Sequence, residues 1–446
     1  MTNLNSFFFT MKILSFMLTI FIGLSHCKQD NPFFTSLKAI CDNTLHPNTC
    51  YDSLFPLIDS NQNTYDPYFL YNTSIQVAMD EISRVNVNFM NILENIYKNT
   101  YLSSVLESCR DSMSLALYNL NRSLLTNGSA LTTRETRTNF RVWISGVGAD
   151  LQTCKDGFKY APNEARDLVF MKLDKASKLV TTSLAIISKI DQLMISSPEN
   201  LSDDHFRSNW EPDWLSFGEW KILDTTNEAM TPDAVVAVDG SGNYKTVTEA
   251  INAVPLGSDK RFVIYVKKGV YKENVKVDYR TLNVLMYGDG MNETIVTGNR
   301  SNKTGSVTSF SSTFAAYGDG FTAKDIGFQN TAGPENDQAM ALLTGSDRSV
   351  FYRCQFEGYQ DTLFTQKNRQ FYRDCKIYGT VDFIFGEAAV VIQNSDILVR
   401  KPLGPTAVIT GQGKSDPNSI SGISIQSCSI DAAEDIGDVK AFLGRP

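Results

Sequence analysis

Two aspartates at equivalent positions of an internal repeat are the residues best suited to chemistry. Each closes a Gly-x-x-Asp turn, in Gly358-Tyr-Gln-Asp361 and in Gly379-Thr-Val-Asp382. If these turns stack on adjacent coils, the carboxyl groups lie roughly 4.8 Å apart, the spacing of neighbouring strands. Repulsion then raises the pKa of one carboxyl while the other stays ionised, which suits an acid beside a nucleophile. A pair of turn aspartates that cap loop amides is the alternative, and the spacing alone leaves both open.

The residues around the two aspartates favour the catalytic interpretation. Gln360 precedes Asp361, and Gln338 begins the run Gln338-Ala-Met-Ala-Leu342. Glutamine amides can donate hydrogen bonds to a developing oxyanion. The apolar Phe-Ile-Phe segment after Asp382 would exclude water from a reacting carboxylate.

The distribution of histidine excludes several mechanisms. The only histidines are His26, His46 and His205, so residues 233–446 contain none. This part of the chain therefore has no Ser-His-Asp or Cys-His arrangement and no histidine zinc site, and it has no Cys-x-x-Cys pair. The sequence predicts hydrolysis on carboxylates, supported by Arg or Lys, without a metal or a cofactor.

The repeat that carries the aspartates predicts the fold of the second half. Residues 351–358 resemble residues 371–379, and weaker copies occur at 321–330, 390–399 and 421–430. Units of about 20 to 33 residues, each a short strand and a turn, indicate stacked coils, and a right-handed parallel β-helix fits best. The residues that align the copies are Phe328, Phe356, Ile377, Ile397 and Ile430.

Three cysteines share one position in this alignment, two residues before the aligned hydrophobic residue. Cys354, Cys375 and Cys428 are therefore expected to point inward as a stack of free thiols, because free cysteine is commonly a small buried hydrophobe. A Cys354–Cys375 disulfide is the alternative.

The first half differs in its periodicity. From residue 31 to residue 200, apolar side chains recur at three- and four-residue spacing, as in 74–97 and 168–193, which predicts an antiparallel helix bundle. Residues 201–232 are acidic and rich in tryptophan without clear periodicity, and we interpret them as a linker.

The N-terminus indicates export. Lys12 precedes an apolar run that is shorter than the roughly 20 residues needed to span a bilayer, so residues 1–27 read as a signal peptide. Extending the run back through residues 7–9 would make it an uncleaved anchor instead, and no later segment is apolar enough to span a membrane.

Glycosylation sequons and cysteines support export. Four cysteines in the helical half suggest two disulfides, whereas Cys27 lies at the signal boundary. The net charge of −8, without a basic cluster, argues against a nucleic-acid partner. The candidate glycosylation sites are Asn72, Asn121, Asn127, Asn200, Asn292, Asn299 and Asn302.

The second half resembles plant pectin methylesterases, and the resemblance rests on six segments in family order. These segments are Asp239-Gly-Ser-Gly242 with Lys245-Thr-Val247, Gly269-Val-Tyr-Lys-Glu-Asn274, Gln338-Ala-Met-Ala-Leu342, Gly358-Tyr-Gln-Asp-Thr-Leu363, Gly379-Thr-Val-Asp-Phe-Ile-Phe-Gly386 and Leu443-Gly-Arg-Pro446. The resemblance implies a right-handed parallel β-helix that cleaves methyl esters of polygalacturonate without a metal.

The resemblance also implies a role for each matching residue. Asp382 is the expected nucleophile, and Asp361 is the expected acid and then base. Gln338 and Gln360 are expected to line the oxyanion hole, and Arg445 to orient Asp382. Tyr359, Phe364 and Phe383 are expected either to touch the sugar chain or to pack in the core.

The first half resembles the pectin methylesterase and invertase inhibitor family, through its four cysteines, Trp143 and Cys154-Lys-Asp-Gly157. This implies a four-helix bundle with Cys41–Cys50 and Cys109–Cys154 disulfides, acting as a pro-region that restrains the esterase. The domains expected are therefore a signal at 1–27, the bundle at 31–200, a linker or processing region at 201–232 and the catalytic domain at 233–446.

Two departures from the family pattern define what remains open. A dibasic cleavage motif is absent before the second half, so removal of the pro-region stays open. The family continues beyond the position of Pro446, so we expect a C-terminally truncated β-helix with an exposed end.

The expected protein is a secreted cell-wall esterase acting on methylesterified pectin, without stable membrane association. The alternatives are a β-helix lyase or polygalacturonase and an inhibitor-like binding protein without turnover.

Overall fold

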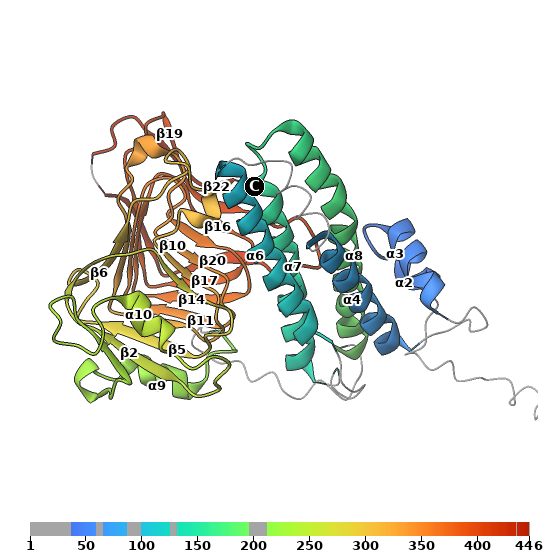
Figure 1. Cartoon of the computed structure of the whole chain (residues 1–446), viewed down its shortest axis with the longest axis horizontal. Helices are drawn as coiled ribbons and strands as arrows, with labels where there is room; N and C mark the ends of the chain where they lie inside the picture. Colours follow the sequence, from blue (N-terminus) through green and yellow to red (C-terminus); the bar gives the residue numbers. More distant parts are fainter. Residues whose placement is uncertain are drawn as a thin grey trace, which may run out of the picture.

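The computed structural model describes residues 37–58, 66–86, 100–124, 131, 133–195, 212–433 and 435–445. The expected signal peptide, Cys27 and the sequons at Asn127 and Asn200 lie outside these residues. Figure 1 shows a bundle of helices lying beside a solenoid of strands. None of the helices within the described residues is long and apolar enough to cross a membrane.

Four long helices form the bundle, and local sequence determines where they begin. Asp66 caps the first one by accepting a hydrogen bond from the Tyr68 amide at 3.0 Å, and Thr133 caps the third by accepting from the Thr136 amide at 3.2 Å. The long helices are α4 (Pro67–Arg84), α6 (Thr100–Arg122), α7 (Arg134–Gly157) and α8 (Asn163–Ile195), preceded by the short α2 (Leu37–Cys41) and α3 (Pro47–Leu54).

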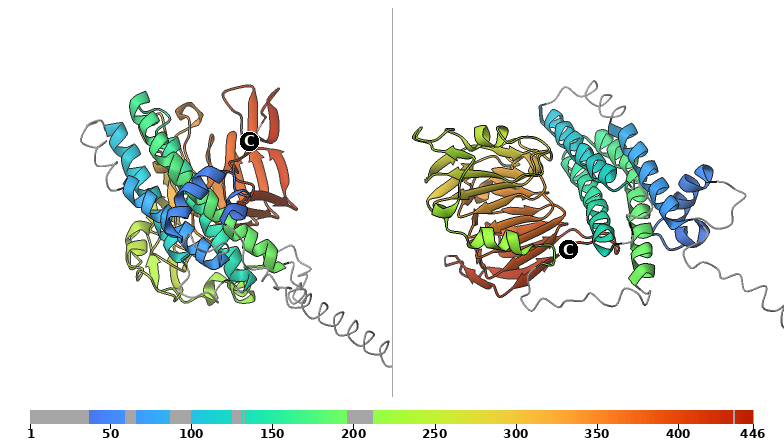
Figure 2. Two further views of the ribbon diagram at one scale, coloured as in Figure 1. Left: turned by 90° about the vertical axis from the view of Figure 1, so that its right-hand side faces the viewer. Right: turned by 90° about the horizontal axis from the view of Figure 1, so that it is seen from below.

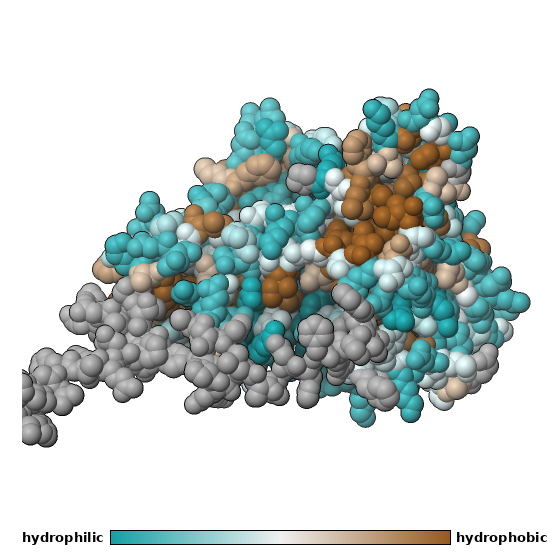
Figure 3. Space-filling view, turned by 180° about the vertical axis from the view of Figure 1, so that it is seen from behind, coloured by the Kyte–Doolittle hydropathy of each residue, from teal (hydrophilic) through white to brown (hydrophobic). Residues whose placement is uncertain are grey.

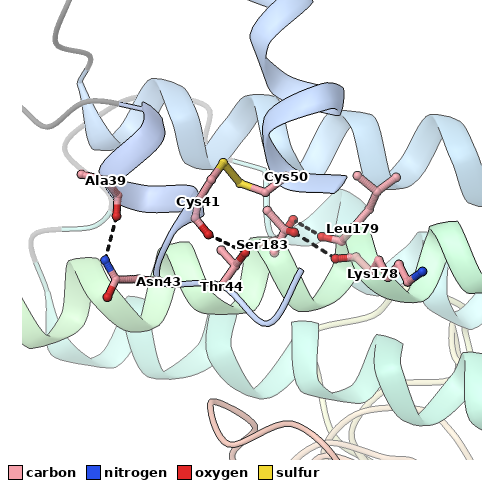
Figure 4. The surroundings of a disulfide bond; sticks show 9 residues. Ala39, Cys41, Asn43, Thr44, Cys50, Lys178, Leu179 and Ser183 are labelled. Atoms are coloured by element: carbon pink, nitrogen blue, oxygen red, sulfur yellow. Dashed lines mark hydrogen bonds between the residues drawn. A yellow bond between two sulfur atoms is a disulfide. The ribbon is translucent and has the colours of Figure 1, made fainter. Parts of the chain in front are cut away.

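Two disulfides hold the helical domain together, and they are the pairs that the family resemblance implies. Cys41 and Cys50 join α2 to α3, as Figure 4 shows. Cys109 and Cys154 join α6 to α7.

The second half is a parallel β-helix built from three sheets, as expected. In each sheet every neighbouring pair of strands is parallel, and from β2 onward the chain returns to the same sheet after visiting the other two. The first sheet contains β1 (Ala234–Val236), β2 (Phe262–Val266), β5 (Val284–Gly288), β8 (Thr322–Lys324), β11 (Ser349–Tyr352), β14 (Arg369–Arg373), β17 (Ala389–Gln393) and β20 (Gly422–Gln426). The second contains β4 (Val275–Val277), β7 (Phe314–Ala316), β10 (Leu342–Thr344), β13 (Leu363–Thr365), β16 (Val381–Gly386), β19 (Thr406–Gln412) and β22 (Lys440–Arg445). The third contains β3 (Gly269–Lys272), β6 (Thr294–Gly298), β9 (Gly327–Asn330), β12 (Gln355–Glu357), β15 (Lys376–Gly379), β18 (Asp396–Val399) and β21 (Ser429–Ala432).

The register predicted from the repeat is confirmed by the strand pairing. Phe328 pairs with Phe356, Phe356 with Ile377, Ile377 with Ile397, and Ile397 with Ile430. Each aligned residue therefore lies directly above the previous one in the third sheet.

The interior of the β-helix is apolar and contains the free cysteines. The rings of Phe328 and Phe356 stack with centroids 5.7 Å apart. Cys354 and Cys375 are buried free thiols, and Cys428 is a half-buried one, so the stack of thiols is observed rather than the alternative disulfide.

The described part of the expected linker is folded, which corrects that interpretation. Helix α9 (Phe217–Asp224) begins with a capping box in which Ser216 and Glu219 satisfy each other's backbone amides. Its Trp220 packs edge-on against Phe371 of β14, with ring centroids 6.1 Å apart, and lies in one apolar cluster with Val350. An apolar contact between distant segments of this kind has no periodicity that the sequence would show.

The last strand of each sheet lies at an edge. Strands β20, β21 and β22 have a neighbour on one side within the described residues, and Ile430, Phe442 and Leu443 on them are 44%, 50% and 62% exposed. Figure 3 shows apolar residues gathered on this upper part of the β-helix surface.

Candidate active site

The two aspartates of the repeat lie on adjacent coils. Asp361 stands in the turn before β13, and its amide donates to the Val381 carbonyl, beside Asp382, at 3.1 Å. Strands β13 and β16 pair with an offset of 21 residues, as in Leu363 and Ile384, and 21 residues also separate the two aspartates. The stacking predicted from the sequence is therefore present.

Both aspartates adopt a backbone conformation that few residue types tolerate. The φ angle is +62° at Asp361 and +48° at Asp382. Aspartate and asparagine enter this left-handed region more readily than most residues, and such conformations concentrate at functional sites. A pairing irregularity in β16 between Val381 and Ile384 accompanies the turn of the backbone at Asp382.

The surroundings of the two carboxyl groups differ. Burial, followed by the negative charge of Asp382, raises the pKa of Asp361 well above its ordinary value, against the opposing charges of Arg445 and Lys159. Asp382 instead receives both arms of the Arg445 guanidinium, with Nε donating to Oδ1 at 2.7 Å and Nη2 donating to Oδ2. The buried carboxyl of Asp361 is thus suited to hold a proton, and the carboxyl of Asp382 is oriented by a guanidinium.

Arg445 reaches the site through the register of three strands. Strand β16 pairs with β19, and β19 pairs with β22, which sets Gly411 opposite Arg445. A Cβ on Gly411 would lie 3.5 Å from the Asp382 carboxyl carbon, in ordinary van der Waals contact, so the carboxylate lies close against β19.

The two expected oxyanion-hole glutamines lie on neighbouring chain segments beside Asp361. Gln338 is half-buried and lines the same cavity as Asp361. Gln360 is also half-buried, and its carbonyl accepts a hydrogen bond from the Ala339 amide at 3.2 Å, which ties the two segments together.

The three expected substrate aromatics divide between cleft and core. Phe364 lines the cavity and stacks on Phe385, with centroids 4.4 Å apart and planes within 2°. Of the two alternatives for Phe383, the structure has core packing, because its side chain is fully buried in the β-helix core. Tyr359 is half-buried, and the guanidinium carbon of Arg400 lies over its ring, 5.1 Å from the ring centroid.

Phe385 is the aromatic residue that sequence reasoning missed. Ile384 pairs with Leu363 and is buried in the core, and successive strand residues point to opposite faces, so Phe385, which pairs with Phe364, lies on the cleft side with it. The alternation of side chains along β16 could have identified Phe385 as a cleft residue if the pairing irregularity between Val381 and Ile384 had been predicted.

The helical domain forms the opposite wall of this cavity, which has a volume of about 270 Å³. Helices α6 and α7 face the β-helix, and α4 and α8 lie on the far side (Figures 1 and 2). The residues from the helical domain that line the cavity are Tyr101, Thr153, Asp156, Gly157, Lys159 and Tyr160.

Charged and polar pairs also join the two domains. Lys367 Nζ lies 2.5 Å from Asp150 Oδ2, and both side chains are almost completely buried. Arg122 of α6 pairs with Asp319, and the Trp143 indole of α7 donates to Asp347 at 3.0 Å.

A glycine permits the close approach of α7. A Cβ on Gly146 would lie 2.9 Å from Asn368 Oδ1, and 3.3 Å from the Lys367 side chain. A larger residue there would require the Asn368 and Lys367 side chains to shift.

Burial at this interface raises the pKa of two carboxyl groups. Burial raises the pKa of Asp150 to about 6, although the neighbouring Lys367 opposes the rise. Burial and the charges of Asp156 and Asp150 raise the pKa of Glu387, at the foot of a second interdomain cavity, to about 7.

The remaining predicted sites are surface features. Asn121, Asn292 and Asn299 are exposed, whereas Asn72 and Asn302 are half-buried, and Asn302 lines the interdomain cavity. No group of three or more His, Cys, Asp or Glu that could hold a metal occurs among the residues that the structure describes.

Both halves of the chain match known families. Residues 233–446 match the family model described as Pectinesterase, and residues 35–186 match the one described as Plant invertase/pectin methylesterase inhibitor. Pectinesterase 3 of Phaseolus vulgaris is 42% identical over 420 residues, which cover 92% of this chain and 71% of that protein. Pectinesterase 2 of Citrus sinensis is 38% identical over 414 residues, which cover 92% of this chain and 76% of that protein.

A solved structure is also similar to the β-helix. The pectin methylesterase from carrot is 50% identical, and the match covers 49% of this chain and 70% of that chain with a TM-score of 0.48.

Proposed function

Because the chain belongs to the pectinesterase family and carries an inhibitor-like domain, we propose that it hydrolyses the methyl esters of pectin. The observation that carries this proposal is the carboxyl pair on adjacent coils. Asp361 is buried with a raised pKa, and Asp382 is paired with Arg445.

The first half of the reaction uses the two carboxyls in different roles. A carboxylate oxygen of Asp382 attacks the ester carbonyl carbon, and the carbonyl oxygen becomes an oxyanion. The side-chain amides of Gln338 and Gln360 donate hydrogen bonds to this oxyanion. As the carbon–oxygen bond to the methoxy group breaks, Asp361 gives up its proton and methanol leaves.

The second half restores both residues. Asp361, now a carboxylate, takes a proton from water, and the hydroxide attacks the acyl carbon that is bound to Asp382. The acyl–oxygen bond to Asp382 breaks, which releases the galacturonic acid carboxyl group, leaves Asp382 as a carboxylate and leaves Asp361 protonated again; the proton of the product carboxyl group then passes to solvent. Arg445 keeps Asp382 oriented throughout, because its two arms fix both carboxylate oxygens.

The stacked rings of Phe364 and Phe385 provide an apolar surface for a sugar ring beside the reacting ester. Their flat faces lie in the cavity that Asp361 and Gln338 line. The substrate class is methylesterified homogalacturonan, which a plant pectinesterase would meet after export to the cell wall. The two disulfides of the helical domain suit such an oxidising compartment.

The helical domain restrains this activity while it lies over the cleft. Tyr101, Lys159 and Tyr160 occupy the space in front of Asp361 through which a polymer would have to pass. The alternative of a binding protein without turnover needs the α6–α7 face for another protein, but here the chain's own β-helix occupies that face. This observation favours a restrained esterase.

The test is methanol release from highly methylated pectin by the purified full chain and by residues 212–446. We expect Asp382→Asn to lower turnover by about three orders of magnitude or more. Asp374→Asn is the matched control, because Asp374 also has a positive φ of +54° and lies on the same coil, just before β15. Equal activity of the Asp382→Asn variant and the control would refute the assignment of the nucleophile. Shortening of the polymer chain would instead indicate a lyase or a polygalacturonase.

A further inference from the structure

We propose that the loop between β6 and β7, residues 299–313, is the anchor by which the β-helix holds the helical domain over the cleft, with Val307 as its central contact. The proposal deepens the regulation of the site and rests on the proposed function only for its consequence, not for the contact itself.

The loop is rigidly built before it meets the helical domain. Ser301 and Thr304 exchange hydrogen bonds, with the Ser301 amide donating to Thr304 Oγ1 at 3.0 Å and the Thr304 amide donating to Ser301 Oγ at 3.2 Å. The Asn302 amide donates to the Gln338 carbonyl at 2.9 Å, and Asn330 Nδ2 donates to the Ser311 carbonyl at 3.1 Å. Such a loop loses little conformational freedom on docking.

Val307 inserts into the hydrophobic core of the other domain. Only 2% of its surface is exposed, and it belongs to the apolar cluster of the helical bundle rather than to that of the β-helix. Phe310, three residues later in the same loop, packs against that cluster as well. The β-helix therefore supplies residues that the bundle uses to complete its own interior.

The bundle offers a matching recess at the end of α7. A Cβ on Gly157 would lie 3.5 Å from both Val307 Cγ1 and Val105 Cγ1, so the two valine side chains lie close against this turn of α7. Beside it, Ser309 Oγ and Ser108 Oγ lie 2.5 Å apart in a hydrogen bond between the domains. Val307 is thus a fully desolvated side chain at this interface, and truncation of such well-packed, desolvated contacts is what costs most binding free energy.

The anchor lies at the cleft itself. Val307, Thr308 and Ser309 line the cavity that also contains Asp361 and Gln338. The charge pairs of the interface, such as Lys367 with Asp150, contact α7 nearer its middle. Release of Val307 would consequently remove the contact that closes the cavity on the side of the catalytic pair.

A single backbone amide reports docking far from the anchor. The Ile420 amide of the β-helix donates to Ser145 Oγ of α7 at 3.0 Å. Ser145 precedes Gly157 by 12 residues, which is about 18 Å along a helix. Exchange of this amide with deuterium therefore measures opening of the whole interface rather than a local change at residue 307.

The experiment compares Val307→Asp with Val270→Asp in the full chain. Val270 is 50% exposed on β3, so an aspartate there tests the effect of the charge alone. We expect Val307→Asp to accelerate exchange at Ile420 at least about tenfold, because a buried valine is replaced by a charged group. The control variant should change the rate by less than about twofold. An unchanged exchange rate in a folded Val307→Asp chain would overturn the proposal.

Two further measurements keep the result clear if the aspartate variant does not fold. Val307→Thr keeps the shape of the side chain and should accelerate exchange about threefold to tenfold, because it places a hydroxyl group in the apolar recess. The exposed pair Lys276 and Asp111, 2.5 Å apart across the interface, should form fewer zero-length cross-links in both Val307 variants. Repeating the measurements in the Asp382→Asn chain separates the two proposals, since loss of turnover would leave the exchange effect intact.

Discussion

Glu387 should make the docking of the helical domain depend on pH. Its pKa is raised from an ordinary value of 4.5 to about 7 by burial under α7 and by the charges of Asp156 and Asp150. A carboxyl whose pKa is raised in the docked state favours docking fully below about pH 4.5, and this contribution is lost as the pH rises through about 7. The helical domain should therefore be held less tightly at neutral pH than at acidic pH.

The size of the effect follows from the shift. About 2.5 pK units correspond to about 3.4 kcal/mol at 1.36 kcal/mol per unit. This value is the maximum contribution of Glu387 to the free energy of docking, because part of its burial comes from the β-helix itself and persists without the bundle. We expect about 1 to 2 kcal/mol to belong to docking. Glu387→Gln should remove this amount of the pH dependence, and Asp150, with its pKa of about 6, should supply the remainder.

The assay is urea unfolding of the full chain at about pH 5 and about pH 8, followed by the circular dichroism of the helices. Wild type and Glu387→Gln should be nearly equal in stability at the lower pH, and the variant should be more stable at the higher pH by about 1 to 2 kcal/mol. Glu293→Gln, which removes an exposed carboxylate in the turn before β6, is the control. A Glu387→Gln chain that loses stability with pH as the wild type does would refute the reasoning.

Three other changes have outcomes that the contacts determine. Lys367→Met leaves Asp150 buried without its ammonium partner, so it should weaken docking by about 3 to 5 kcal/mol. The loss would be measured as faster amide exchange at the domain interface, and an added Asp150→Leu change should restore most of it. Arg445→Met should lower kcat for methanol release at least about tenfold and move the acidic limb of the pH–rate profile to higher pH. Arg445→Lys should retain part of the activity, and an unchanged profile would count against an orienting role. A chain beginning at residue 233 should be less stable in urea than one beginning at residue 212 by about 2 to 4 kcal/mol, because Phe371 is no longer covered by α9. Equal urea midpoints for the two chains would mean that α9 does not stabilise the β-helix.

The sequence specified the β-helix well because its information is local and repeated. One aligned residue per coil, from Phe328 to Ile430, was enough to predict the strand register that the structure contains. The same alignment brought Asp361 and Asp382 together, since equivalent positions of stacked coils must be neighbours.

The parts that could not be predicted depend on contacts between distant segments. Trp220 shows no periodicity, and its helix is stabilised by Phe371 on another element. The recess for Val307 exists because Gly157 and Val105 come together on different helices. The inward position of Phe383 follows from an irregularity in β16 that single-strand alternation does not foresee.

The column of free thiols has a consequence for the lifetime of the protein. Burial raises the pKa of Cys375 to about 12 and that of Cys354 well above its ordinary value. At about pH 6 only about one Cys375 in a million is then a thiolate, the form that reacts with oxidants and disulfides. The β-helix can therefore share a chain with two disulfides and still keep these sulfurs unreacted, so that ageing by oxidation should begin elsewhere, at exposed methionines such as Met171.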